Sequence, residues 1–171
     1  VEQNTYSVLM SVYYKENAEY LDKSMESMFQ QSVSPNDFVL VCDGPLGNSL
    51  ENVIEEKKKR YGDLLQVVRL QENRGLGNAL NEGLKYCRNE LVARMDSDDI
   101  SVPERCERQL GIFAQRPMLS VVSGTVLEFV KSIEEICGKR ELPVNSEEIV
   151  LFSKKRNPFN HPAIMFRKSA V

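Results

Sequence analysis

The stretch that decides the fold is Leu91-Val92-Ala93-Arg94-Met95-Asp96-Ser97-Asp98-Asp99, where a mostly apolar run meets three carboxylates. Such a run is typical of a strand buried in a sheet. Bare carboxylates are costly in an apolar interior, so we expect Asp96, Asp98 and Asp99 at the end of that strand, facing solvent, a cation or a ligand. Two carboxylates two residues apart at a strand end suit a hard divalent cation that also holds phosphate oxygens.

The composition is that of an ordinary soluble globular protein of 171 residues, with 42% hydrophobic residues, 27% charged residues and a net charge of -3. This charge gives no reason to expect nonspecific nucleic-acid binding. No apolar run is long enough for a membrane span, and no signal-peptide pattern opens the sequence. Cys42, Cys87 and Cys106 fall in apolar patterns without metal-ligand spacing, which predicts reduced core residues in a cytoplasmic protein.

Strand-like and helix-like segments alternate through the first two thirds of the chain. Apolar runs predict strands at residues 6–12, 38–42 and 64–70 and at the run from residue 91, with amphipathic helices between them. This alternation predicts an α/β fold with a mostly parallel central sheet flanked by helices.

The last third of the sequence is less regular. Pro103 is suited to the first position of a helix, and residues 119–130 look like one strand that Gly124 bends. Residues 131–145 show no clear hydrophobic period, which predicts a loop or hairpin. Ser146 is placed to cap a short helix through Phe152, and residues 163–166 form a final apolar run.

Polar segments follow each of the four predicted parallel strands. Open α/β sheets bind ligands at the carboxyl ends of their strands, so these segments are expected to form one site. The segments are residues 13–16, Asp43-Gly44, residues 73–78 and residues 96–99.

Each of these segments also has a simpler interpretation. Asp43-Gly44-Pro45 has the composition of a tight turn, and the Gly75-Leu76-Gly77 segment suits a strand-to-helix turn. The Gly75-Leu76-Gly77 segment does not match a dinucleotide-binding fingerprint, because it lacks the third glycine and follows the third strand, not the first. A calcium loop from Asp96 is excluded because Ile100 and Ser101 stand where an oxygen ligand and a glycine are needed. His161, a lone histidine, could be purely structural.

Together the strand-end motifs resemble family 2 glycosyltransferases of the GT-A fold. The motifs are SVYYKE (11–16), VCDG (41–44), NRGLGNALNEG (73–83), RMDSDD (94–99), PER (103–105) and NHPAIMFRKS (160–169). The resemblance covers nearly the whole chain and is greatest to bacterial enzymes that build O-antigen and exopolysaccharide repeats, including those of the amylovoran type. It implies a Rossmann-like GT-A domain over residues 1–171 that binds a nucleotide sugar.

The resemblance also implies roles for individual residues. Asp43 matches the aspartate that contacts the edge of the base. Asp98 matches the ligand of Mn²⁺ or Mg²⁺ in the Asp-x-Asp motif, and Asp96 matches the residue on the ribose side. Asp99 has no implied role, and His161 is a candidate on the acceptor side. The residues matched to the donor nucleotide are Tyr13, Glu16, Asp43, Arg74, Asn78, Asp96 and Ser97.

The implied reaction is metal-dependent, inverting transfer of a hexose from a nucleotide diphosphate sugar, with a UDP-sugar favoured. The acceptor would be a growing bacterial surface polysaccharide or a lipid-linked oligosaccharide, which places the enzyme in the cytoplasm or at the inner face of the cytoplasmic membrane. A cation on Asp98 would stabilise negative charge on the leaving diphosphate. The family places its general base in a Glu-Asp pair downstream of the His-Pro segment, so we expect that base beyond Val171.

Two other functions fit parts of the pattern. A nucleotide-sugar-binding module without turnover would share the donor site and lack the base. A sugar-nucleotide pyrophosphorylase would share the α/β layout, but it would need a glycine-rich phosphate loop after the first strand. Residues 11–16 contain no glycine, which argues against that activity.

Overall fold

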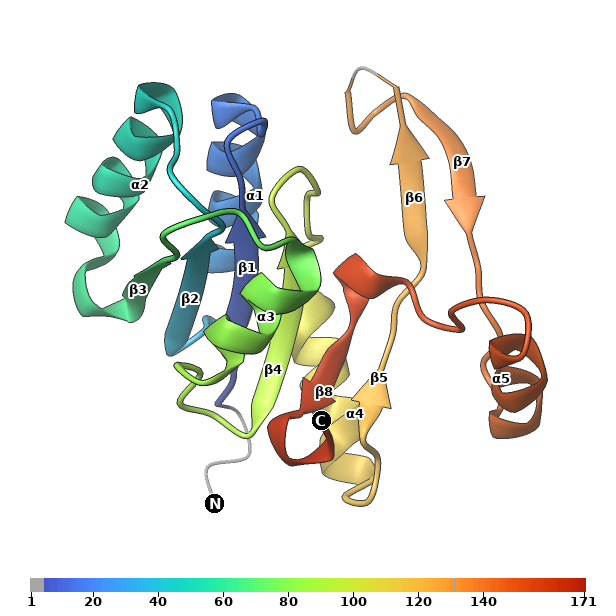
Figure 1. The fold of residues 1–171 in the computed structure, drawn as a ribbon. Coiled ribbons are helices and arrows are strands. Elements are labelled where there is room, and N and C mark those ends of the chain that lie inside the picture. Colours follow the sequence, from blue (N-terminus) through green and yellow to red (C-terminus); the bar gives the residue numbers. More distant parts are fainter. Residues whose placement is uncertain (1–4, 131) are drawn as a thin grey trace.

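The computed structural model describes residues 5–130 and 132–171, and its centre is a six-stranded sheet in the order β3-β2-β1-β4-β8-β5 (Figure 1). Strands β3, β2, β1 and β4 are parallel, whereas β8 runs antiparallel to both β4 and β5. The predicted α/β fold with a mostly parallel sheet is confirmed. The strands are β1 (Ser7–Val12), β2 (Asp37–Cys42), β3 (Leu65–Arg69), β4 (Leu91–Asp96), β5 (Val121–Val122) and β8 (Met165–Arg167).

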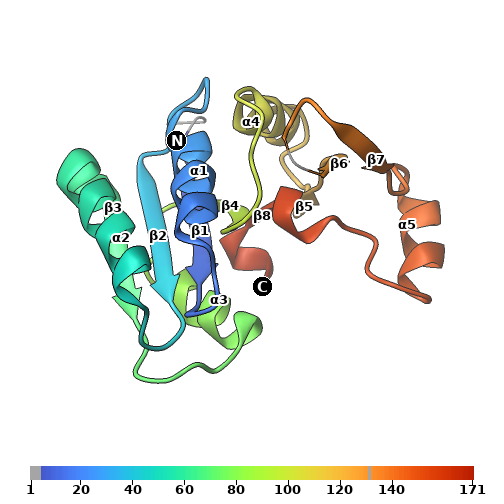
Figure 2. The ribbon, with the colours of Figure 1, turned by 90° about the horizontal axis from the view of Figure 1, so that it is seen from above.

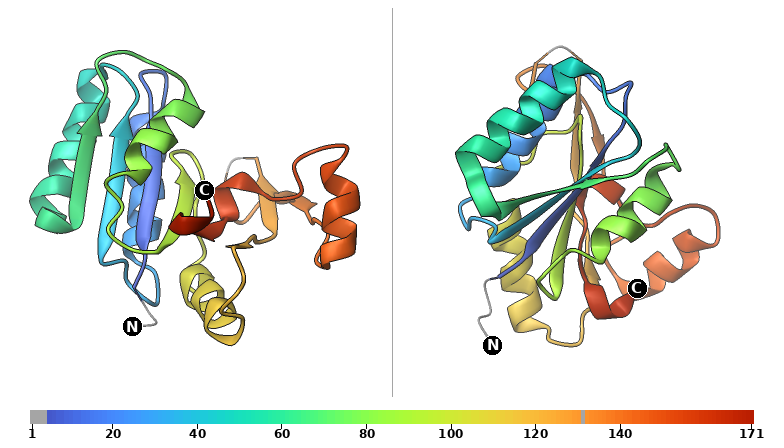
Figure 3. Two further views of the ribbon diagram at one scale, coloured as in Figure 1. Left: turned by 60° about the horizontal axis from the view of Figure 1, so that its bottom comes forward. Right: turned by 60° about the vertical axis from the view of Figure 1, so that its left-hand side comes forward.

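Helices cover both faces of this sheet. Helices α1 (Ala18–Phe29), α2 (Asn48–Tyr61) and α4 (Arg105–Gln115) pack on one face, and α3 (Leu76–Leu84) packs on the other (Figure 3). Because β1 and β2 are buried between these layers, most positions along them are apolar. Short 3₁₀ turns lie at Gly62–Leu64, His161–Ala163 and Lys168–Ala170.

A small second unit stands beside the main sheet. Strand β6 (Val126–Phe129) pairs with β7 (Ile136–Arg140) in a two-stranded antiparallel sheet, and α5 (Ser146–Ser153) follows it (Figure 1). The segment 131–145, predicted to form a loop or hairpin, supplies only the second strand of this hairpin, since β6 lies before it; residue 131 is outside the described part of the chain. Within that part, no helix has both the length and the apolar character needed to cross a membrane.

Three sequence-based boundaries were wrong, two of them because a contact between distant segments decided the boundary. Helix α4 begins at Arg105, since the Pro103 carbonyl accepts the Ser32 N–H at 2.8 Å. The single strand expected at residues 119–130 is split, because β5 pairs with β8 in the main sheet and β6 pairs with β7. The side chain that caps α5 is Asn145, which accepts the Glu148 N–H at 2.9 Å, and Ser146 is already inside the helix.

Gly83 lets α3 lie close to the sheet. A Cβ at this position would be 2.4 Å from Cγ2 of Val41 and 2.6 Å from Cδ1 of Leu9. Both distances are shorter than a carbon–carbon contact allows. The position of α3, and of the strand-end loop that precedes it, therefore depends on the absence of a side chain at residue 83.

We expect Gly83→Ala to destabilise the protein by about 1–3 kcal/mol, because the added methyl group overpacks the sheet and outweighs the better helix propensity of alanine. Gly111→Ala in α4 is the matched control, since a Cβ there meets no atom within 4 Å. The control should be stabilised by about 0.5–1 kcal/mol. Urea unfolding monitored by circular dichroism measures both changes, and equal effects would contradict the close-approach argument.

Candidate functional site at the carboxyl ends of the strands

The carboxyl ends of β1, β2 and β4 meet at one edge of the sheet (Figure 2). The chain places β2 and β3 on one side of β1, and then crosses over to place β4 on the other side. Ser11 of β1 pairs with Asp96 of β4, so the two strands end at the same level. The order of the strands thus reverses at β1 and β4, and open α/β sheets bind ligands outside the carboxyl ends of the strands at such a switch point.

Three carboxylates gather at this switch point. Asp96, Asp98 and Asp99 each offer a ligand oxygen, and these oxygens lie within 4.8 Å of one another. The structure therefore brings together the two residues of the Asp-x-Asp motif and also Asp99, to which the family resemblance assigned no role. Such a set of hard oxygen donors fits a divalent cation, Mg²⁺ or Mn²⁺.

The electrostatics of the cluster also favour a cation. Burial, together with the nearby charges of Asp96 and Asp98, raises the pKa of Asp99 to about 6. Burial and the charges of Glu16 and Asp96 raise the pKa of Asp98 as well. Burial contributes most to both shifts and the neighbouring carboxylates add to it, and a bound cation would favour the charged form of each group.

Neighbouring side chains hold the cluster in place. The Ser97 hydroxyl donates to the Glu16 carboxylate at 2.6 Å, which joins the segment after β1 to the segment after β4. The Ser24 hydroxyl of α1 donates to the Asp96 carbonyl at 2.6 Å. The Arg94 guanidinium forms an ion pair with the Asp96 carboxylate. Glu16 and Ser97, both matched to the donor site, are thus direct partners.

Gln31, which the sequence analysis missed, anchors the loop after the carboxylates. Its side-chain amide donates to the Ser101 hydroxyl at 3.1 Å and to the Val102 carbonyl at 2.9 Å, and its side-chain carbonyl accepts the Cys106 N–H at 3.0 Å. Gln31 is 4% exposed, so these bonds are shielded from water. A single glutamine at a helix end carries no sequence signal for this role.

Asp43 is buried at the end of β2, where its carboxylate accepts the backbone N–H groups of Arg74 and Gly75 at 2.8 and 2.9 Å. Gly44 follows with a φ of +87°, and a Cβ there would be 2.7 Å from the Asn73 nitrogen. Asp43 and Gly44 thus fix the position of the loop before α3. Each carboxylate oxygen has a second lone pair and can still accept a bond from a ligand.

The other predicted donor-site residues surround this edge with looser contacts. The Asn78 side chain donates to the Arg74 carbonyl at 2.7 Å, which stabilises the start of α3. The Arg74 guanidinium pairs with Glu72 at 3.1 Å on the surface. Tyr13 is 42% exposed and stacks edge-on against Tyr14. Their exposed side chains leave them available to a ligand.

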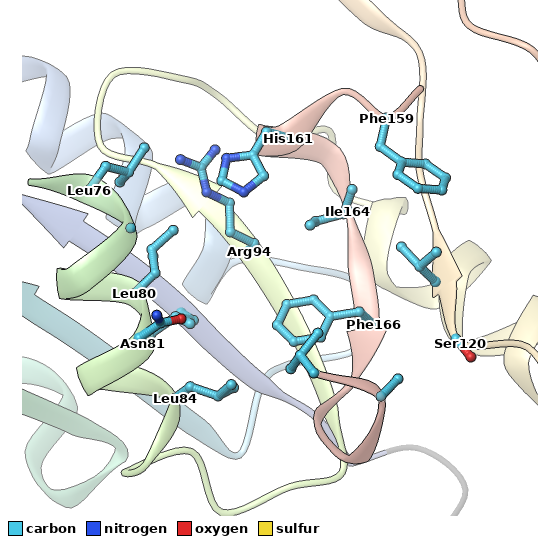
Figure 4. Close-up of a pocket in the computed structure, with 15 residues that line it drawn as sticks. Leu76, Leu80, Asn81, Leu84, Arg94, Ser120, Phe159, His161, Ile164 and Phe166 are labelled. Carbon is cyan, nitrogen blue, oxygen red and sulfur yellow. The ribbon is translucent and has the colours of Figure 1, made fainter. Parts of the chain in front are cut away.

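His161 lies next to Arg94, in the 3₁₀ turn before β8, which is the neighbour of β4 on the side away from β1 (Figure 4). Burial and the Arg94 charge lower the pKa of His161, which favours the neutral imidazole. The segment that carries it is fixed by α4, since Arg105 donates to the Arg94 and Ile164 carbonyls at 2.7 and 3.0 Å. Gln109 adds a bond of 2.9 Å to the Ala163 carbonyl.

Curated relatives match nearly the whole chain. The amylovoran biosynthesis glycosyltransferase AmsE of Erwinia amylovora is 40% identical over 168 residues, which are 97% of this chain and 61% of the relative. An Escherichia coli UDP-Gal:α-D-GlcNAc-diphosphoundecaprenol β-1,3-galactosyltransferase is 34% identical over 97% of this chain and 59% of its own length. The chain thus spans about 60% of the length of these relatives.

A solved structure shows the same fold. The mannosyltransferase of Pyrobaculum calidifontis, in complex with GDP-Man and Mn²⁺, superposes with a TM-score of 0.66 at 17% identity. The match covers 96% of this chain and 44% of that protein. The predicted GT-A arrangement is therefore confirmed at the level of the fold. The sequence profile of glycosyl transferase family 2 matches residues 7–171, and the chain belongs to that family.

Proposed function

We propose that the strand-end site binds the nucleotide diphosphate sugar of a metal-dependent, inverting glycosyltransferase, and that residues 1–171 form its donor-binding domain. The observation that carries this proposal is the group of Asp96, Asp98 and Asp99 at the switch point between β1 and β4, with excess negative charge. A diphosphate is itself an anion, so it can approach these carboxylates only together with a cation.

In this proposal the chain binds the two ends of the donor with different groups. Asp98 and Asp99 would hold Mn²⁺ or Mg²⁺, and the cation would supply positive charge that offsets the charge of the diphosphate. Asp96 contacts the ribose side. Glu16 and Ser97, hydrogen-bonded at 2.6 Å, keep the first and fourth strand ends together around the donor. The Pyrobaculum enzyme, bound to GDP-Man and Mn²⁺, supports a cation with a nucleotide sugar on this fold.

In this proposal Asp43 contacts the base of the donor nucleotide. Its carboxylate is already fixed by two backbone N–H groups, so it needs no reordering to accept a further donor from the base edge. Tyr13, Arg74 and Asn78 complete this end. We favour UDP because the Escherichia coli relative is described as using UDP-Gal.

We propose that the acceptor is a surface-polysaccharide or lipid-linked saccharide, taken from the side of β4 on which His161 lies. The Erwinia amylovora and Escherichia coli relatives are described as acting in amylovoran biosynthesis and on a diphosphoundecaprenol-linked sugar. Such an acceptor would place the protein in the cytoplasm at the inner membrane face. The competing proposal, binding without turnover, is distinguished by incubating the full-length protein with UDP-hexose and following hexose transfer to the lipid-linked saccharide.

We expect Asp98→Asn to weaken Mn²⁺-dependent UDP binding by at least about tenfold, because the variant removes one charged ligand of the cation. Isothermal titration calorimetry with and without Mn²⁺ measures the change. Asp63→Asn, an exposed carboxylate before β3 at the opposite edge of the sheet, is the control and should leave binding unchanged. Unchanged Mn²⁺-dependent affinity in Asp98→Asn would refute the metal assignment.

Asp43→Asn should weaken UDP binding by about tenfold both with and without Mn²⁺, since one strong acceptor is lost at the base end. Binding of inorganic pyrophosphate with Mn²⁺ should change little, because pyrophosphate has no base. Parallel titrations with the two ligands test this difference. Equal losses for both ligands would show that Asp43 acts only through the position of the loop at Arg74 and Gly75.

The affinity for Mn²⁺ should fall as the pH drops through about 6, the raised pKa of Asp99. Above that pH the Asp99 carboxylate is charged and binds the cation, whereas below it a proton competes with the cation. Between pH 7.5 and 5.5 we expect a loss of about fourfold from this group. Asp99→Asn should bind Mn²⁺ more weakly with a flatter pH profile, and an unaltered profile would exclude Asp99 from the site.

A further inference from the structure

A cavity lies where the small second unit meets the segment that carries His161. Its volume is about 330 Å³, which is within the range of small-ligand sites. The polar side chains that line it are Arg140 at the end of β7, Arg156 and Asn157 after α5, and Asn160 and His161. No carboxylate lines this cavity in the described part of the chain, so its lining differs in charge from the carboxylate cluster after β4.

Both arginines of the cavity keep hydrogen-bond donors for a ligand. Arg156 is exposed, and its guanidinium makes no hydrogen bond or ion pair with any described residue, although it lies 5.7 Å from the centre of the Phe152 ring. Arg140 forms an ion pair with Glu128 through one guanidinium nitrogen, Nη2. A guanidinium has five N–H donors, so this pair leaves most of those of Arg140 free. The cavity thus offers cationic donors from two separate segments of the chain.

Hydrogen bonds of Asn160 hold the walls of the cavity together. Asn160 is only 4% exposed, and its side-chain amide donates to the Arg140 carbonyl at 3.0 Å and to the Gly124 carbonyl at 2.9 Å. Its backbone N–H donates to the Ser123 hydroxyl at 3.1 Å. The end of β7 is therefore tied to the segment that carries His161. A cavity with walls fixed in this way needs little reordering when a ligand binds.

The sequence around the cavity is also biased towards positive charge. Residues 149–171 contain no Asp or Glu, whereas the chain as a whole has a net charge of -3. The basic residues in that range are Lys154, Lys155, Arg156, Arg167 and Lys168. Lys154 and Lys155 directly precede Arg156 and add to the positive potential on this side of the molecule. An anion is therefore the class of ligand that the cavity attracts.

We propose that this cavity binds the phosphate groups of a saccharide diphosphate acceptor, with Arg140 and Arg156 on the phosphate oxygens. A guanidinium binds phosphate through pairs of N–H donors. His161 lines the cavity and also lies next to Arg94, which pairs with Asp96 (Figure 4). The sugar of the acceptor would thus lie near His161, between its own phosphates and the donor site. The identity of the anion rests on the proposed function, since the Escherichia coli relative is described as acting on a diphosphoundecaprenol-linked sugar.

Calorimetry with the full-length protein in EDTA tests this site without turnover. The probes are N-acetylglucosamine hexyl diphosphate and the neutral hexyl N-acetylglucosaminide. The diphosphate should bind more tightly, and Arg156→Gln should lower its affinity by at least about tenfold, because one charged pair of donors is lost. Arg108→Gln, an exposed arginine on α4, is the matched control and should leave the affinity unchanged. Equal affinities for the two probes, or equal losses in the two variants, would overturn the proposal.

Two further measurements separate this cavity from the donor site and from a lipid surface. Asp98→Asn should bind the diphosphate probe in EDTA as the wild type does, and a changed affinity would place the probe at the carboxylate cluster instead. Vesicles of phosphatidylglycerol test a lipid headgroup, and loss of vesicle binding in Arg156→Gln without loss of diphosphate affinity would overturn the acceptor assignment. Titration of UDP with Mn²⁺ reports the donor site separately, so either proposal can fail while the other stands.

Discussion

Carboxylates repel one another, and the structure is arranged so that three of them can meet where β4 ends. Asp96, Asp98 and Asp99 share a small volume that is partly shielded from water. Burial and mutual repulsion raise the pKa of Asp99 to about 6. A group of this kind persists in a folded protein only where neighbouring contacts hold it. Here those contacts are the Arg94 guanidinium, the Ser24 hydroxyl and the Glu16–Ser97 hydrogen bond.

The supporting contacts come from several segments that are distant in the sequence. Ser24 of helix α1 holds the β4 strand end, and Gln31, just after that helix, holds the loop that follows the strand. Helix α4 supplies Arg105, which bonds the backbone of β4 and of the His161 segment at once. Across β1, Asp43 fixes the loop before α3. The two ends of the proposed donor site are therefore positioned by separate sets of hydrogen bonds.

Much of the fold, and the position of the candidate site residues at the strand ends, could be predicted because the signals are local. Apolar runs of strand length, such as the one before Asp96, are readable wherever a strand is buried on both faces. The boundaries at Pro103 and at residues 119–130 were wrong, since the Ser32 N–H and the pairing of β5 with β8 are contacts between distant segments. Gln31 and the partners of Arg94 could not be predicted for the same reason.

The sequence by itself determined the alternating α/β pattern, the polar strand ends and the carboxylates after β4, because side-chain chemistry and short-range periodicity suffice for these. Only the tertiary structure decided that Asp99 joins Asp96 and Asp98 and that Asp43 bonds the loop at Gly75. It also decided that Arg94 is buried, with two guanidinium nitrogens that have no hydrogen-bond partner in the described part of the chain. These features depend on which strands become neighbours and on how closely the layers pack. Contacts of this kind form only when distant segments of the folded chain come together, so they cannot be predicted from local sequence patterns.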